Sequence, residues 1–318
     1  MMKAIAITGP TASGKTELSL LVAERLSAEI ISSDSMQIYK KMDIGTAKAT
    51  PEERARVPHH LIDFLDPRET YSVEAYRRDA LLAMEDISAR GKLPLFVGGT
   101  GLYIDSLLRG ESSSSPEGDP EYREKILASV KSEEDKTALW ERLLSVDPES
   151  AEAIHKNNVK RVIRALEIYD KTGKPKSWHD ARTRSEGAAL PILMLTLDFH
   201  DREALYERIN LRVDAMVKSG LVDEVRELYL AGMLPPESTA SQAIGYKEML
   251  SFIKGERSLH EACEEIKLAS RRYAKRQLTW FRHKDSVRLF ADNEDGRRRP
   301  PEELAREALE HINEFLER

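Results

Sequence analysis

The first third of the chain alternates short apolar runs with longer amphipathic stretches. The apolar runs have the length of buried strands, and we predict strands at residues 4–8, 29–32, 60–64 and 93–97. Residues 17–26, 73–89 and 101–108 have apolar positions at helical spacing. Strands that alternate with helices are typical of a parallel sheet, so this region predicts an α/β fold.

The pattern changes near residue 111. Residues 111–120 contain four consecutive serines with Gly and Pro nearby and no apolar side chain, which is typical of a linker. Residues 121–183 are helical in pattern, a strand-like run returns at 192–197, and residues 202–318 are mostly helical with a short strand at 286–290. We therefore predict an α/β core domain from residues 1–112 and 188–318, with a helical insertion domain at 113–187.

Residues 9–16 connect the first predicted strand to the first helix with the spacing of a phosphate-binding loop. Glycines let backbone N–H groups close around an anion, and the helix start adds the positive end of its dipole. Lys15 supplies a mobile cation, and the Thr16 hydroxyl can bind Mg²⁺. The sequence therefore predicts a P-loop NTPase-like fold whose diphosphate or nucleotide ligand is bound by Gly9, Pro10, Thr11, Ala12, Ser13, Gly14, Lys15 and Thr16.

Two further predicted strands end in polar or glycine-rich residues, where ligands of open α/β sheets bind. Asp34 follows the second strand and is a candidate general base or Mg²⁺ ligand, with a helix cap or turn as the alternative. Residues 98–101, Gly-Gly-Thr-Gly, allow close backbone approach to a ligand and offer the Thr100 hydroxyl, although the segment alone favours a plain strand-to-helix turn. Asp63 or Asp198 could instead supply the carboxylate that holds Mg²⁺ in an ATP hydrolase.

Basic residues are concentrated in a few segments of a chain whose net charge is −6. Any nucleic-acid site must therefore be a local patch. Arg208 and Arg212 lie four apart on a predicted helix and could reach a diphosphate from one face. The residues alone favour the alternative of a solvated charged face with Glu207 and Asp214. Two other groups favour an RNA or DNA partner, with a solvated charged face as the alternative: Lys160, Arg161 and Arg164, and Lys267, Arg271, Lys275 and Arg282.

The single cysteine and the short apolar runs indicate the cellular compartment that we expect for the protein. Cys263 is the single cysteine, which excludes an internal disulfide and a cysteine-based zinc module and suits a reducing cytosol. No apolar run approaches the length of a membrane span. We expect a cytoplasmic monomer with no membrane association, no structural metal and no obligate protein partner.

Seven segments, in order along nearly the whole chain, resemble signatures of the bacterial tRNA dimethylallyltransferases. They are GPTASGKT at 9–16, SDSMQIYKKMDIGTAK at 33–48, PHHLIDFLDP at 58–67, LFVGGTGLY at 95–103, NVKRVIRALE at 158–167, AIGYKEM at 243–249 and KRQLTWFR at 275–282. Eukaryotic relatives have a C-terminal zinc finger that this sequence lacks, so the resemblance is to the shorter bacterial form.

The resemblance implies a prenyltransferase that moves a dimethylallyl group from dimethylallyl diphosphate to N6 of the adenosine immediately 3′ of the anticodon in tRNA. It implies Asp34 as the general base, with Thr11, Arg212 and Mg²⁺ stabilising the diphosphate that the phosphate loop holds. It also implies a flipped adenosine and a mobile insertion domain over the anticodon stem. The tRNA-contacting positions it implies are Asp34, Ser35, Met36, Gln37, Thr100, Arg123, Lys160, Arg161, Arg164, Gln242, Gly245, Lys247, Lys275, Arg276, Gln277, Trp280 and Arg282.

Two alternatives share part of this pattern. A small-molecule or nucleotide kinase would use the same loop and fold, with ATP as the ligand, but would not need a basic helical insertion. A nucleotide-gated RNA-binding protein would use the loop and the basic segments, but a general base at Asp34 would be superfluous.

Overall fold

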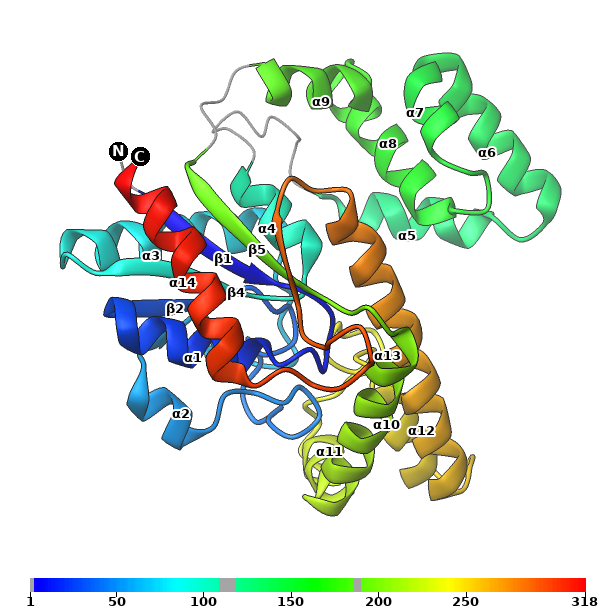
Figure 1. Ribbon diagram of the computed structural model, residues 1–318. Helices are drawn as coiled ribbons and strands as arrows, with labels where there is room; N and C mark the ends of the chain where they lie inside the picture. Colours follow the sequence, from blue (N-terminus) through cyan, green and yellow to red (C-terminus); the bar gives the residue numbers. More distant parts are fainter. Residues whose placement is uncertain (1–2, 109–117, 186–189) are drawn as a thin grey trace. The chain divides into compact units, whose positions relative to one another are not determined.

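The computed structural model describes residues 3–108, 118–185 and 190–318 (Figure 1). The chain divides into two compact units, one formed by Met1–Leu107 with Pro191–Arg318 and the other by Leu108–Leu190. The first unit contains a parallel sheet and its covering helices, and the second is helical. Among the described residues, no helix is both long and apolar enough to cross a membrane.

The sheet of the first unit has six strands in the order β3-β2-β4-β1-β5-β6, and every neighbouring pair is parallel. This arrangement confirms the predicted α/β fold. β1 lies between β4 and β5, so the carboxyl ends of β2, β4 and β1 are adjacent, where ligands of open sheets bind. The strands are β1 (Ala4–Thr8), β2 (Ala28–Ser32), β3 (His59–His60), β4 (Leu93–Gly98), β5 (Ile192–Asp198) and β6 (Val287–Phe290).

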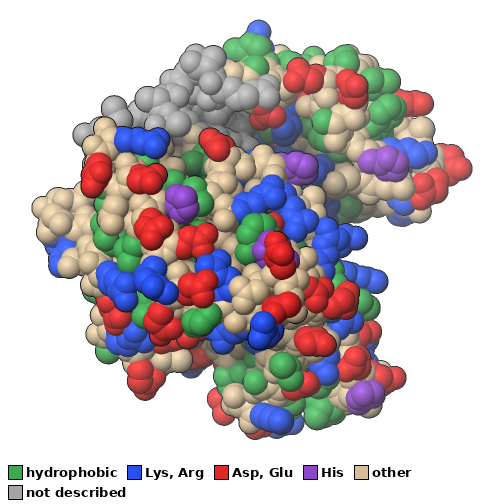
Figure 2. Space-filling view, in the orientation of Figure 1, with side chains coloured by type: hydrophobic (Ala, Val, Ile, Leu, Met, Phe, Trp, Pro, Cys, Tyr) green, Lys and Arg blue, Asp and Glu red, His purple; other side chains and the backbone are tan. Residues whose placement is uncertain are grey.

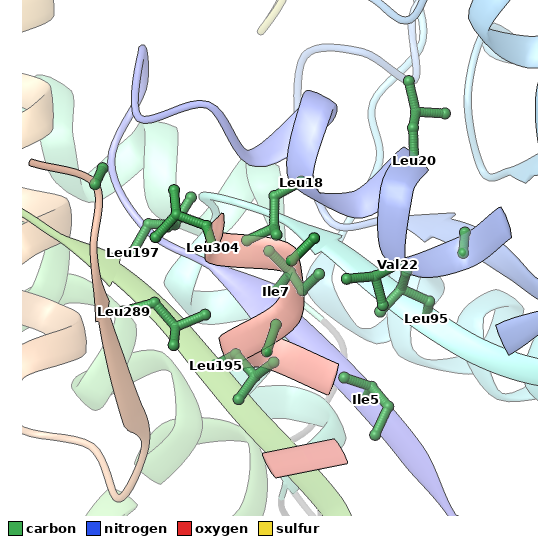
Figure 3. Packing of buried hydrophobic residues seen from close by; sticks show 14 of the residues in the cluster. Ile5, Ile7, Leu18, Leu20, Val22, Leu95, Leu195, Leu197, Leu289 and Leu304 are labelled. Carbon is green, nitrogen blue, oxygen red and sulfur yellow. The ribbon is translucent and has the colours of Figure 1, made fainter. Parts of the chain in front are cut away.

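Helices cover both faces of the sheet, which explains why β1 and β2 are buried along their whole length. α1 (Lys15–Leu26) and α14 (Pro301–Glu317) pack together on one face, and α3 (Val73–Ala89) packs against β2 and β4 on the other (Figure 1). Figure 3 shows Leu18 and Val22 of α1 and Leu304 of α14 packed over the central strands. The strand side chains in this core include Ile5, Ile7, Leu95, Leu195, Leu197 and Leu289.

Four of the remaining helices of this unit form a second buried core beside the sheet. Val213, Leu221, Val225, Tyr246 and Ile266 belong to this core, which also includes residues of the segment that follows β2. The helices of this core are α10 (Arg202–Lys218), α11 (Leu221–Leu230), α12 (Tyr246–Ile253) and α13 (Leu259–Arg282). The unit also contains α2 (Pro51–Arg56) and α4 (Gly101–Leu108).

The prediction of a strand at 60–64 is wrong. The strand ends at His60, because Leu61 and Asp63 have left-handed backbone angles, with φ of 56° and 59°. The Asp63 carboxylate instead pairs with Lys48 at 2.8 Å and with Arg54 at 3.3 Å. The first helix begins at Lys15, two residues before the predicted start, because left-handed Gly14 is its N-cap.

The second unit consists of five helices within the part of it that the structure describes. They surround a small core that includes Leu143, Val162 and Leu166. The helices are α5 (Pro120–Ser129), α6 (Glu133–Val146), α7 (Pro148–Ala153), α8 (Val159–Thr172) and α9 (Lys176–Ser185). Most of the predicted linker at 111–120 lies outside the described residues, and Pro120 begins α5 with Asp119 as its N-cap.

Candidate active site

A cavity of about 650 Å³ opens at the carboxyl ends of β1, β2 and β4. The phosphate loop, the turn after β2 and the Gly98-Gly99 pair form one side, and residues of α10 and α13 form another. Residues 45–47 and 242–245 also line it. The cavity thus brings together the four segments that the sequence predicted near a diphosphate: the phosphate loop, the Asp34 turn, the 98–101 loop and the helix with Arg208 and Arg212.

The phosphate loop has the backbone conformation that its glycines permit. Gly9 has a φ of 138°, and a Cβ at this position would lie 2.8 Å from the carbonyl oxygen of Leu197. Gly14 has a φ of 97° at the start of α1. Ser13 is buried, and its Oγ has no hydrogen-bond partner among the described residues. An unpaired buried hydroxyl inside this loop is suited to an oxygen-rich ligand.

Lys15 is folded back onto the loop. Its Nζ donates hydrogen bonds to the carbonyl oxygens of Gly9 at 3.0 Å and Pro10 at 2.6 Å. Burial, together with the nearby positive charge of Arg212, lowers the pKa of Lys15 to about 7, while the charge of Asp34 acts in the opposite direction. An anion in the loop would restore the charged form of the ammonium group.

Two arginines of α10 face the same cavity but differ in their hydrogen bonding. Arg208 donates from Nε to the carbonyl oxygen of Ala12 at 2.9 Å, which fixes a residue with a left-handed φ of 61°. Arg212 forms no hydrogen bond or ion pair with any residue that the structure describes. Burial lowers the pKa of both guanidinium groups. A partly buried cation that forms no ion pair is costly, and the nearby charge of Asp34 offsets this cost only in part, so Arg212 favours an anionic ligand in the cavity.

Asp34 occupies the turn directly after β2. Its Oδ1 accepts hydrogen bonds from the backbone nitrogens of Met36 at 2.9 Å and Gln37 at 3.4 Å. Its Oδ2 has no partner within the described part of the chain, so one carboxylate oxygen is available to a ligand. The preceding residue is held by a 2.6 Å hydrogen bond between the hydroxyls of Ser33 and Tyr76.

The loop after β4 supports the same turn. Thr100 Oγ1 accepts a hydrogen bond from the backbone nitrogen of Ser35 at 3.0 Å, and Thr100 N donates to the carbonyl oxygen of Ser33 at 3.2 Å. A Cβ on Gly98 would lie 2.1 Å from that same Ser33 oxygen. Glycine at position 98 therefore allows the β2 and β4 loops to pack directly against each other.

A carboxylate of α11 fixes another wall of the cavity. Glu224 accepts hydrogen bonds from the backbone nitrogens of Asp43, Ile44 and Gly45 and from the Tyr246 hydroxyl, at distances of 2.6–3.1 Å. A Cβ on Gly45 would lie 2.5 Å from the Tyr246 ring.

The same wall is tied to the Asp34 turn. Gln37 Nε2 donates to the carbonyl oxygens of Thr46 at 3.3 Å and Ala47 at 3.2 Å. The sequence analysis did not identify Glu224, and it included Tyr246 only as part of the AIGYKEM segment. No local motif links either residue to residues 43–47.

The basic face predicted for α13 is only partly open. Lys267 pairs with Asp214 at 2.9 Å, Arg271 donates to Asn210, and Arg282 pairs with buried Asp198 at 2.9 Å. Lys275 and Arg276 are exposed. Figure 2 shows Lys and Arg side chains gathered along the edge where α13 runs in Figure 1. The other predicted contacts of this helix, Gln277 and Trp280, point inward: Gln277 is buried, and the Trp280 ring lies against Gly101.

The structure separates the remaining candidate tRNA contacts into exposed and internally paired residues. Lys160 and Arg161 are exposed on α8, whereas Arg123 and Arg164 both pair with the buried Glu167. In the other unit, Gln242 and Lys247 are exposed, and Gly245 is the left-handed N-cap of α12. Asp63 and Asp198, the alternative candidates for an Mg²⁺-binding carboxylate, do not line the cavity. Both form ion pairs instead, Asp63 with Lys48 and Asp198 with Arg282.

The parallel sheet, the phosphate loop and the cavity at the carboxyl edge define a protein of the P-loop class. The sequence profile of the family described as IPP transferase matches residues 37–284, and that of Isopentenyl transferase matches residues 2–63. The chain belongs to the IPP transferase family, which confirms the resemblance indicated by its motifs.

Similar proteins cover nearly the whole chain. A tRNA dimethylallyltransferase of Thermoanaerobacter sp. (strain X514) is 50% identical over 290 residues, which cover 90% of each protein. One from Carboxydothermus hydrogenoformans is 45% identical over 314 residues, which cover 99% of each. The crystal structure of the tRNA isopentenylpyrophosphate transferase of Bacillus halodurans is 42% identical, with a TM-score of 0.71 and coverage of 100% of this chain and 97% of that one. A eukaryotic dimethylallyltransferase acting on tRNA is 33% identical, with a TM-score of 0.77 over 91% of this chain and 74% of its own.

Proposed function

We propose that this protein transfers the dimethylallyl group of dimethylallyl diphosphate to N6 of the adenosine immediately 3′ of the anticodon in tRNA and releases diphosphate. Prenyl transfer to tRNA is the activity of the family to which the chain belongs. The observation that best supports the finer proposal is the cavity itself, in which the phosphate loop, Arg212 and Asp34 line one space of about 650 Å³.

The donor's diphosphate would occupy the phosphate loop. Lys15 and the unpartnered Arg212 would neutralise the negative charge that develops as the bond between the allylic carbon and the diphosphate oxygen breaks. The buried Ser13 hydroxyl and the Thr11 side chain lie in the same loop and can donate hydrogen bonds to diphosphate oxygens. The departing diphosphate takes the electron pair of the broken bond.

The site also fits Mg²⁺, which prefers oxygen ligands and commonly bridges protein to substrate phosphates. The Thr16 hydroxyl lines the cavity at the start of α1, and diphosphate oxygens would complete the coordination. When bound, Mg²⁺ would supply additional positive charge to the leaving group.

Asp34 would act on the acceptor. An exocyclic adenine amine is a poor nucleophile, and transfer of its proton to a nearby carboxylate makes the attack easier. The free Asp34 Oδ2 is suited to accept this proton as the new bond between N6 and the allylic carbon forms. The adenosine would reach the cavity by flipping out of the anticodon loop, and its presence would exclude water from the allylic carbon.

The exposed cations on both units would bind the tRNA backbone. Such contacts position the RNA and make its binding salt-dependent. We propose that the helical insertion at 113–187 contacts the anticodon stem through Lys160 and Arg161. In the sheet unit, the exposed residues proposed to contact tRNA are Gln242, Lys247, Lys275 and Arg276. We also propose a monomer that works in the cytoplasm, where its single cysteine would stay reduced.

The test is transfer of isotope-labelled dimethylallyl diphosphate to tRNA that lacks the modification, with the labelled nucleoside identified after digestion. We expect label at one adenosine next to the anticodon. ATP-dependent release of nucleoside diphosphate without prenyl transfer would instead establish a kinase. Binding of tRNA without any transfer would establish an RNA-binding protein.

A further inference from the structure

The side chain of Gln277 joins the phosphate loop to the loop after β4. Its Oε1 accepts a hydrogen bond from the backbone nitrogen of Thr11 at 2.8 Å, and its Nε2 donates to the carbonyl oxygen of Gly99 at 2.9 Å. Only 5% of the residue is exposed. Because an amide oxygen accepts and an amide nitrogen donates, the two partners determine the orientation of the side chain.

Gly99 makes room for this amide. A Cβ on Gly99 would lie 2.2 Å from Gln277 Nε2, which is closer than two such atoms can approach. The neighbouring Gly98 makes room for a different group, because a Cβ added there would lie 2.1 Å from the Ser33 carbonyl oxygen. The two adjacent glycines therefore make room for different groups: Gly98 for the Ser33 carbonyl oxygen, and Gly99 first for the Gln277 amide and then for the Gly9 carbonyl oxygen, which its Cβ would meet at 3.2 Å.

We propose that Gln277 is a positioning residue for the donor's diphosphate and does not contact the tRNA. By engaging the backbone nitrogen of Thr11, it fixes the start of the phosphate loop so that the Thr11 side chain lines the cavity. Both polar groups of Gln277 are used inside the protein. The exposed side chains of Lys275 and Arg276 in the same turn of α13 remain available to RNA. The inference rests on the proposed function, because it concerns how the donor of that reaction is held.

Gln277→Met tests the role, because methionine has a similar volume but makes neither hydrogen bond. The probe is inorganic pyrophosphate with Mg²⁺, titrated by calorimetry, beside steady-state KM values for dimethylallyl diphosphate and tRNA. We expect pyrophosphate affinity to fall about 10–100-fold, as for the loss of one or two buried hydrogen bonds. The KM for tRNA should change by less than about twofold.

Lys275→Met is the comparison from the same turn, because Lys275 is exposed and does not line the cavity, and it should raise the KM for tRNA while pyrophosphate affinity is unchanged. His260→Gln, at an exposed position near the start of α13, should alter neither quantity. If Gln277→Met raised the KM for tRNA and left pyrophosphate affinity unchanged, Gln277 would be an RNA contact and the inference would be wrong.

A double-mutant cycle covers the case in which Gln277→Met does not fold. Gly99→Ala should weaken pyrophosphate binding in the natural background because it displaces the amide. In a Gln277→Ser background the same change should add much less, since the shorter side chain removes the 2.2 Å contact and leaves the milder 3.2 Å contact with the Gly9 carbonyl oxygen. Full additivity of the two effects would contradict the inference. Pyrophosphate binding requires no acceptor, so a protein that bound it normally but prenylated no tRNA would refute the proposed function and leave the inference intact.

Discussion

The state of Lys15 leads to a prediction about proton uptake. Its pKa is about 7 in the free protein, lowered by burial and by Arg212. A bound diphosphate places negative charge beside the ammonium group and raises this pKa again. At a pH above 7, the protein must therefore take up a proton at Lys15 when the ligand binds.

The expected size follows from the pKa. A group with a pKa of about 7 is about 90% deprotonated at pH 8 and about 10% deprotonated at pH 6. Binding should thus take up about 0.9 proton at Lys15 at pH 8 and about 0.1 at pH 6, and the affinity contributed by Lys15 should fall about eightfold between pH 7.5 and pH 8.5.

The assay is calorimetry of pyrophosphate binding with Mg²⁺ in buffers of different ionisation enthalpy, which counts the protons exchanged. Lys15→Arg is the matched variant, because a guanidinium group keeps its positive charge between about pH 6 and pH 8.5 and therefore takes up no proton when the ligand binds. The difference between the two proteins removes the ligand's own contribution. Equal proton uptake by natural protein and Lys15→Arg at pH 8 would refute the reasoning.

Three further changes test the site and its support. Arg212→Met should raise the melting temperature of the unliganded protein, because it removes a partly buried cation that forms no ion pair. The rate of prenyl transfer should fall about 10²–10³-fold. A lower melting temperature would contradict the stability prediction. Glu224→Gln should lower the free energy of unfolding by about 1–3 kcal/mol in chemical denaturation, because an amide cannot accept all four of the hydrogen bonds described above, and unchanged stability would show that the 43–45 loop does not depend on it. Gly9→Ala should abolish pyrophosphate binding, because the added methyl group meets the Leu197 carbonyl oxygen at 2.8 Å; normal binding would disprove the loop geometry.

The parts of the site that the sequence predicted are those with local signals. The phosphate loop combines a motif with a preceding strand and a following helix, and Asp34 and Thr100 were found because they follow strands that end at one edge of a parallel sheet. Arg212 was a candidate because it shares a helical face with Arg208, yet only the structure shows that it forms no hydrogen bond or ion pair with the described residues.

The parts that the sequence did not predict depend on contacts between distant residues. Glu224 reaches the 43–45 loop across about 180 positions, and Gln277, which the sequence predicted only as a tRNA contact, reaches Thr11 across 266. Neither distance leaves a periodic or motif signal. The strand predicted at 60–64 was wrong for a related reason, since its apolar residues suggested a strand while the ion pairs of Asp63 favour a turned backbone.

The central claim is that Asp34 accepts the proton of the adenine amine while the diphosphate lies in the phosphate loop. Single-turnover prenyl transfer by Asp34→Asn, at saturating donor and tRNA, tests it most directly, with pyrophosphate affinity measured beside it. We predict a rate lower by about 10²–10⁴-fold with pyrophosphate affinity nearly unchanged. A single-turnover rate equal to that of the natural protein would contradict the account.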